Sequence, residues 1–268
     1  MRSVLPRPSP CTRPHRAAPP PRAASGPGTR QSWDVRRFVS TVLFFNPLSG
    51  AAQALLGPPL KALGVMAQPA SAVVPPAVPA PGLPVLFDAA AALGGAGPPW
   101  GALDDGVMGG VSVSGLELEP AGGEAGGPAA VFRGVLSTAN NGGFASVRTR
   151  NFAPPADASG AAGVELRLKG DGQRYKLFIR TAEGWDALAY GAGFDTKAGE
   201  WQTVRLPWAA FRAIFRARSV PGAPPLEKGR ICSLQLMLSK FEVDGALNPA
   251  FRGDGTFALP VSRIATFA

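Results

Sequence analysis

From about residue 100 onward, the chain is a succession of short segments in which apolar and polar residues alternate, separated by turns rich in Gly, Asn and Pro. In the segment 163–170, Val164, Leu166 and Leu168 alternate with charged residues, and the segment 174–181 repeats the pattern. A period of two places alternate side chains on opposite faces of a half-buried β-strand, whereas an amphipathic helix needs a period of about 3.6. This pattern predicts an all-β protein.

Nine segments are predicted as strands on this basis: 115–120, 130–138, 144–152, 163–170, 174–181, 185–194, 201–208, 231–240 and 256–267. Such a series, with almost no helical pattern, indicates an antiparallel β-sandwich of jelly-roll type. Asp171 and Gly172 tolerate the positive φ angles of a tight hairpin, so they are predicted to join their flanking strands as neighbours. The segment 206–219 is predicted to hold a short helix or an irregular crossover. Core-edge packing is predicted for Trp100, Trp185, Trp201 and Trp208.

The positive charge of the chain is concentrated in its N-terminal third. Of the net charge of +9, residues 1–87 supply nine Lys or Arg and one acid, and the rest of the chain has 18 basic and 17 acidic residues. The near-neutral remainder argues against a strong phosphate-tracking surface. The first third is rich in Arg, Ser, Pro and Ala, which is typical of an organelle transit peptide, plastid or mitochondrial.

A second targeting signal is an alternative within this region. Arg36 and Arg37 precede an apolar run and a small-residue site at 52–54, as in a twin-arginine thylakoid signal; the other interpretation is a longer ordinary transit peptide. Prolines interrupt the run, so no transmembrane segment is predicted, and membrane association would be peripheral. We therefore assign residues 1–85 to targeting and a Pro/Ala linker, and 86–268 to the folded domain. The expected location is the chloroplast (stroma, thylakoid surface or lumen), with the mitochondrion as the alternative.

The residue types that are scarce restrict the chemistry. The one histidine, His15, lies in the targeting region, and the two cysteines are Cys11 and Cys232. Histidine-based catalysis, an internal disulfide in the mature domain and thiolate metal clusters are thus excluded, and Cys232 in its apolar run is predicted to be a buried, inert thiol. No phosphate-binding glycine motif is present. No catalytic residue, cofactor or metal site is predicted, although a carboxylate-only enzyme such as a glycosidase stays formally open.

Five motifs occur in a fixed order: WGALDDGVMGGVS, VFRGVLSTANNGGFASVRT, LRLKGDGQRYKLFIRT, WQTVRLPWAAF and GDGTFALPVSRI. Together they resemble the NADH:ubiquinone oxidoreductase complex I intermediate-associated protein 30 family over about 170 residues, from Trp100 to the C terminus. The sequence is most similar to the plant and algal plastid variety, in which the domain accompanies an atypical short-chain dehydrogenase domain. The resemblance implies a galactose-binding-like jelly roll.

The resemblance also implies non-enzymatic work. Mitochondrial members assist complex I assembly, and plastid fused members are linked to photosystem II biogenesis, including translation of the messenger RNA of its core subunit. No dinucleotide-binding domain accompanies the motifs in this sequence, so whatever that domain contributes does not carry over. We expect an assembly factor that binds protein subunits of an organelle membrane complex, of photosystem II or NDH/complex I type. The alternatives are an RNA-associated module supporting plastid translation and a carbohydrate-binding module.

Two polar loops are the candidate binding residues. DDGVMGG holds Asp104, Asp105 and Met108, and a second loop holds Asn140 and Asn141. One interpretation is structural: the aspartates bond to their own turn, and Met108 plugs the end of the core. The other is a polar rim at one end of the sandwich that grips a protein partner or a sugar. A calcium site fits poorly because the spacing is not that of an EF-hand, and adjacent aspartates make a poor acid/base pair.

The one local cluster of positive charge is the set Arg205, Arg212, Arg216 and Arg218, interleaved with two phenylalanines. An RNA platform combines such cations with aromatic rings. The alternative is an amphipathic crossover with the phenylalanines inside and the arginines extending outward. RNA contact through these arginines is kept as the alternative function.

Overall fold

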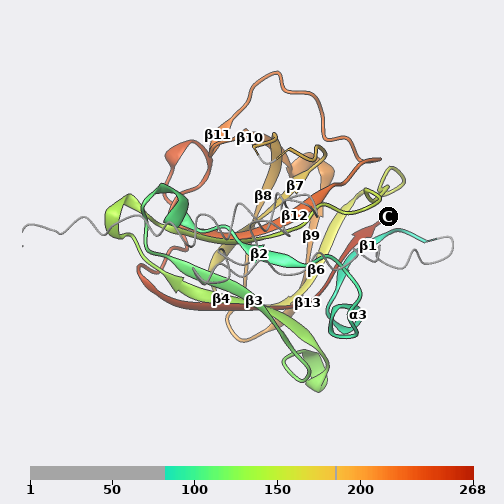
Figure 1. Cartoon of the computed structure of the whole chain (residues 1–268), viewed down its shortest axis with the longest axis horizontal. Coiled ribbons are helices and arrows are strands. Elements are labelled where there is room, and N and C mark those ends of the chain that lie inside the picture. Colours follow the sequence, from blue (N-terminus) through green and yellow to red (C-terminus); the bar gives the residue numbers. More distant parts are fainter. Residues whose placement is uncertain (1–81, 185) are drawn as a thin grey trace, which may run out of the picture. The chain divides into compact units, whose positions relative to one another are not determined.

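The computed structural model describes residues 82–184 and 186–268, which leaves the predicted targeting region, most of the linker and Trp185 outside the described residues. Within them, the strands form two antiparallel sheets that lie face to face (Figure 1). The first sheet has the order β3-β4-β13-β6-β9, with β1 paired to β13. The second has the order β11-β10-β8-β7-β12-β5-β2.

The strands of the first sheet are β1 (Val85–Asp88), β3 (Val113–Glu119), β4 (Ala129–Leu136), β6 (Gly163–Lys169), β9 (Trp201–Pro207) and β13 (Gly255–Phe267). Those of the second are β2 (Trp100–Ala102), β5 (Phe144–Thr149), β7 (Arg174–Arg180), β8 (Ala189–Asp195), β10 (Arg212–Phe215), β11 (Arg218–Ser219) and β12 (Ser233–Ser239). The nine predicted strands are all present, and the prediction of an all-β, antiparallel jelly-roll sandwich is confirmed.

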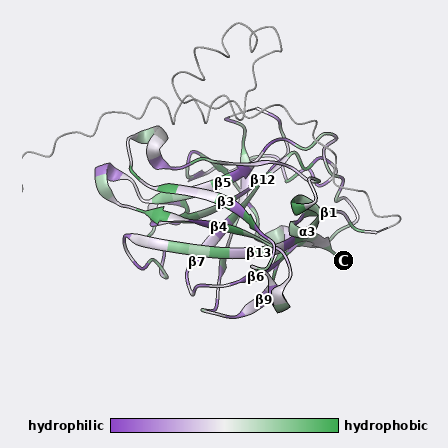
Figure 2. Cartoon of the chain, turned by 60° about the horizontal axis from the view of Figure 1, so that its bottom comes forward, coloured by the Kyte–Doolittle hydropathy of each residue, from purple (hydrophilic) through white to green (hydrophobic). Residues whose placement is uncertain are grey.

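Alternation along the strands builds the core between the sheets. The predicted inward positions Val164, Leu166 and Leu168 of β6 are fully buried, and so are Tyr175 and its neighbours at every second position of β7. Figure 2 shows the resulting alternation of hydrophobic and hydrophilic residues along the strands. The prediction of core-edge tryptophans is confirmed for two of them. Trp100 packs edge-on against Phe87 at 5.5 Å between ring centroids, and Trp208 packs on the core and donates to the Ala161 carbonyl at 2.6 Å.

The predicted hairpin at Asp171 and Gly172 is wrong in one respect, because β6 and β7 belong to different sheets. Gly172 does adopt positive φ (84°), but the turn carries the chain across the sandwich. Asp171 fixes this crossing, since its carboxylate accepts bonds from the Gln173 backbone N–H (3.0 Å) and from the hydroxyl of buried Tyr175 (2.7 Å). The sequence showed a tight turn but not which sheet the next strand joins.

The prediction for the segment 206–219 is confirmed in part, because a short 3₁₀ helix there carries the chain from β9 of the first sheet to β10 of the second. After β9 a 3₁₀ turn, η4 (Trp208–Ala210), leads into a hairpin made by β10 and β11. Its two-residue turn, Arg216–Ala217, has positive φ at both positions (46° and 62°). This conformation normally favours Gly or Asn, so the sequence carried no recognisable turn signal.

Helical structure is sparse among the described residues. The α-helix α3 (Ala89–Leu93) is capped by Asp88, whose carboxylate accepts from the backbone N–H groups of the first turn. The other 3₁₀ turns are η1 (Asp105–Met108), η2 (Glu124–Gly126), η3 (Ala139–Asn141) and η5 (Val243–Gly245). None of the helices in the described part is long and apolar enough to cross a membrane.

Candidate functional site at the loop end of the sandwich

The two candidate loops lie together at one end of the sandwich. The loop containing η1 precedes β3, and the loop containing η3 joins β4 to β5. They meet the loop that follows β12, where the Lys240 N–H donates to the Gly143 carbonyl at 2.7 Å. Figure 1 shows these loops on the left of the domain, with α3 and the C terminus on the right. We call this region the loop end.

Asp105 joins the two loops. Its carboxylate accepts from the backbone N–H (2.9 Å) and hydroxyl (2.6 Å) of Ser112, and from the N–H groups of Gly143 (2.7 Å) and Phe144 (3.2 Å). The side chain is almost completely buried. Gly142 explains part of this close fit, because a Cβ there would lie 2.5 Å from the carboxylate.

Asp104 also links separate parts of the chain, because its carboxylate bonds to residues of β3 and β5. Its carboxylate accepts from the N–H (2.8 Å) and hydroxyl (2.5 Å) of Ser114 in β3, and from the N–H of Ser146 in β5 (2.9 Å). The two adjacent aspartates therefore tie η1 to both sheets. These buried carboxylates order the loop end, so they are not the solvent-facing acceptors that a partner-gripping rim requires.

Other residues of the two loops, and not the aspartates, are exposed to solvent. Met108 is 76% exposed, so the prediction that it plugs the core is wrong. Its position follows from η1, a 3₁₀ turn that ends at Gly109 with positive φ. Asn140 and Asn141 are also exposed, both with positive φ (55° and 61°), a conformation that Asn tolerates better than most residues. The structure thus brings Met108, Asn140 and Asn141 to one end of the sandwich.

The loop end also carries exposed apolar side chains that the sequence did not single out. Val113 and Val135 face each other across β3 and β4 at the end of that strand pair, and both are exposed. Phe241 and Leu247 pair across the loop after β12, and Leu247 is 65% exposed. The exposure of Val135 could have been predicted from the sequence, because this apolar residue occupies a solvent-facing position in the alternation of β4. The loop residues gave no such signal.

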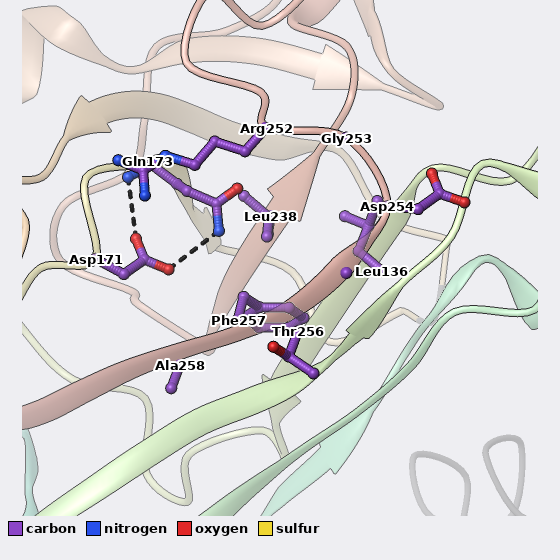
Figure 3. Close-up of a pocket in the computed structure, with 11 residues that line it drawn as sticks. Leu136, Asp171, Gln173, Leu238, Arg252, Gly253, Asp254, Thr256, Phe257 and Ala258 are labelled. Atoms are coloured by element: carbon purple, nitrogen blue, oxygen red, sulfur yellow. Dashed lines mark hydrogen bonds between the residues drawn. The ribbon is translucent and has the colours of Figure 1, made fainter.

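A pocket of about 310 Å³ opens at the same end. Figure 3 shows Asp171 and Gln173 on one wall, Arg252 beside them, and Phe257 on the opposite side. Asp171 is bonded to Gln173 and to Tyr175, and burial, with the Asp171 charge, raises the pKa of that tyrosine. The pocket is lined by Leu136, Asp171, Gln173, Leu238, Arg252, Gly253, Asp254, Gly255, Thr256, Phe257 and Ala258.

Asp254 connects this pocket to the η3 loop. Its carboxylate accepts from the Thr138 N–H (2.9 Å) and the Ser137 hydroxyl (3.0 Å), and these bonds lower its pKa below the ordinary 3.8. A depressed pKa contributes stability above the unfolded value, and that contribution is lost as the pH falls below 3.8 toward the folded pKa. A carboxyl titration followed by NMR should place the Asp254 midpoint below 3.8. A midpoint at or above 3.8 would contradict the two bonds.

The candidate RNA-contacting arginines fall on two sheets. Arg205 lies on β9 of the first sheet, 3.2 Å from Glu165, with its guanidinium over the Phe267 ring. Arg212, Arg216 and Arg218 lie on the β10–β11 hairpin of the second sheet. Arg216 pairs with Asp186 at 2.5 Å and lies over the Phe215 ring.

The remaining candidate chemistry is limited within the described residues. Cys232 is fully buried and its pKa is raised by burial, as expected of an unreactive thiol. No group of three or more His, Cys, Asp or Glu side chains in the described part is placed to hold a metal ion.

Two carbohydrate-binding modules are among the solved structures with a partly similar chain path. The family 11 carbohydrate-binding module of the cellulase Lic26A-Cel5E from Clostridium thermocellum is 16% identical, with a TM-score of 0.47 over 70% of this chain and 95% of that module. A family 61 module crystallised with β-1,4-galactotriose is 14% identical, with a TM-score of 0.32 over 63% of this chain and 88% of that chain. With identities this low and TM-scores below 0.5, neither likeness assigns a function to this protein.

Sequence relatives are more specific. An uncharacterized protein of Schizosaccharomyces pombe is 31% identical over 151 residues, which cover 52% of this chain and 68% of that protein. The complex I intermediate-associated protein 30 family matches residues 90–261, from α3 into β13. Because this match spans well over half of the chain and includes both candidate loops, the protein belongs to the complex I intermediate-associated protein 30 family.

Proposed function

We propose that this protein is a non-enzymatic assembly factor that binds protein subunits of an organelle membrane complex through its loop end. The observation that carries the proposal is the gathering of exposed apolar side chains on loops that buried hydrogen bonds hold in place, in a member of a family named for complex I intermediates. Exposed apolar groups lose unfavourable contact with water on binding a partner. A pre-ordered surface loses little conformational entropy in doing so.

The contact surface that we propose combines two kinds of group. Met108, Val135 and Leu247 supply apolar area, and Asn140 and Asn141 supply amide donors and acceptors around it. An apolar centre with a polar margin is the usual arrangement at protein interfaces. Asp104 and Asp105 support this surface from below, since their carboxylates are already bonded within the fold.

The client and the location are part of the proposal. The Arg-, Ser- and Pro-rich first third supports import into an organelle, the chloroplast first and the mitochondrion as the alternative. The corresponding clients are photosystem II or an NDH/complex I-type enzyme. Similarity of the motifs to the plastid variety of the family supports the chloroplast.

The test is affinity capture of the tagged protein from solubilised organelle membranes, with and without nuclease, followed by mass spectrometry. We expect subunits of one membrane complex in both halves. Met108→Asp combined with Leu247→Asp should reduce their recovery about tenfold or more, because a charge would be desolvated within an apolar contact. Leu93→Asp is the matched control: Leu93 is 43% exposed on α3, away from the loop end, and this variant should capture as the parent does.

Two results would redirect the proposal. Loss of all partners with nuclease would favour the RNA alternative, and Arg212→Gln with Arg218→Gln would then be the variants to compare. Retention on a galactan or glucan resin, competed by the free sugar, would favour the carbohydrate alternative, for which the pocket beside Arg252 offers polar groups around an apolar side chain. Equal capture by the loop-end and Leu93 variants would remove the loop end as the contact surface.

A further inference from the structure

The outer face of the second sheet carries a cluster of polar side chains that the loop end does not include. In the register of the strands, Gln235 of β12 lies opposite Arg148 of β5, and Ser233 lies opposite Arg180 of β7. The intervening Leu234 and Leu236 are in the core, so these four side chains extend from the opposite face of the sheet. We call Arg148, Arg180, Ser233 and Gln235 the outer cluster.

Hydrogen bonds orient part of the outer cluster. Arg180 Nη1 donates to Gln235 Oε1 at 2.8 Å, and Gln235 Nε2 donates in turn to the Ser146 hydroxyl at 2.9 Å. Nε of Arg180 and Oγ of Ser233, both in the outer cluster, have no hydrogen-bond partner among the described residues. The Ser233 side chain is completely buried, so its hydroxyl cannot turn to bulk water. A buried polar atom left unbonded is costly, and it indicates a missing partner.

The charges of the cluster are of one sign. The pKa of Arg180 is lowered to about 9, first by burial and then by the positive charge of Arg148, and burial lowers the pKa of Arg148 to about 10. Asp186 raises the pKa of Arg180, but that carboxylate is already the partner of Arg216 at 2.5 Å. Nearer the loop end, the same face carries two further cations, Arg174 and Lys176. Glu242 provides their counter-charge, at 3.1 Å from Arg174 and 3.9 Å from Lys176.

We propose that the outer cluster binds an oxyanion, the carboxylate or phosphate group of a ligand, with Arg180 and Ser233 as its donors. An oxyanion would accept from the unbonded Nε and Oγ and would offset the repulsion between the two guanidinium groups. Guanidinium groups suit both anions, because their donors are fixed in a planar fork that matches paired oxygens. Arg180 is the one member of the outer cluster that is not fully buried, so an anion would approach along this side chain. This proposal does not rest on the assembly role.

The test is titration of the full-length protein with inorganic phosphate, and separately with acetate, at constant ionic strength maintained with sodium chloride. Calorimetry gives the Kd, and thermal unfolding gives the stabilisation. We expect saturable binding of at least one of the two anions and a rise in Tm beyond that in chloride alone. Whether phosphate or acetate binds tells whether the site accepts a phosphate or a carboxylate group.

Arg180→Gln should weaken binding about tenfold or more, since a charged donor to the anion is removed. Arg180→Gln also loses the Nη1 bond to Gln235, so its Tm in chloride alone serves as its own reference. The rise in Tm that phosphate or acetate adds to that reference is the measure of binding, and a purely structural role of Arg180 would leave this rise unchanged. Ser233→Ala removes a hydroxyl that has no internal partner, so it should fold and should bind more weakly. Arg205→Gln, an exposed arginine on β9 of the first sheet and therefore outside the outer cluster, is the matched control and should bind as the parent does.

Two outcomes would overturn the proposal. One is the absence of any effect of phosphate and acetate beyond chloride. The other is binding that Arg180→Gln and Ser233→Ala both leave unchanged.

Discussion

Replacing Asp105 by Ala should lower the stability of the domain by about 4 kcal/mol. The buried carboxylate accepts bonds from Ser112, Gly143 and Phe144, and alanine would leave the backbone N–H groups of all three without that acceptor. Each stranded buried donor is costly, and the space left by the carboxylate adds to the loss. For a domain of this size the change corresponds to a fall in Tm of roughly 10 °C, measurable by calorimetry.

Asp254→Asn provides the comparison. Asp254 also links backbone and hydroxyl groups of the η3 loop, but it is exposed, so water can replace the lost bonds. Asp254→Asn should therefore lower the free energy of unfolding clearly less than Asp105→Ala does. If the two variants melted alike, the burial of Asp105 would not be what makes it important. Asp105→Ala should also abolish partner capture below its melting temperature, because the loops that carry Met108 and Asn140 lose their common anchor.

Replacing Gly134 by Ala should lower the free energy of unfolding by about 3 kcal/mol, the second large effect that we expect. Gly134 lies within β4, where a Cβ would run into the Val113 carbonyl oxygen and come within 2.8 Å of the Ser114 Cα of β3. These are backbone atoms, so the two strands would have to move apart rather than a side chain turn aside. Chemical denaturation of the variant should show a lower midpoint with little change in slope.

Gly115→Ala is the matched control, in the partner strand one position along. A Cβ at Gly115 meets nothing within 4 Å, so alanine should be neutral or slightly stabilising, as expected for a strand glycine in open space. Equal destabilisation by the two variants would show that loss of strand flexibility, and not the close approach of β3, governs the effect.

The alternation of apolar and polar residues was enough to predict the strands, the absence of helical layers and the burial of inward residues such as Leu166 and Leu177. These follow from alternation, which is local and needs no knowledge of the partner strand. The five ordered motifs also determined the family. The polar loops at Asp104 and Asn140 were recognisable as special, because carboxylates, amides and glycines gather there.

The contacts that those loops make could not be predicted from the sequence, because they depend on how distant strands pair. Asp105 and Gly143 are 38 residues apart, and whether a carboxylate faces solvent or a distant backbone N–H depends on the pairing of strands. The same reason explains the turn at Asp171, which joins strands of different sheets, and the outer cluster, which forms because the register places Arg180, Gln235 and Arg148 on neighbouring strands. Local pattern gives the face of a residue, and only long-range pairing gives its neighbours.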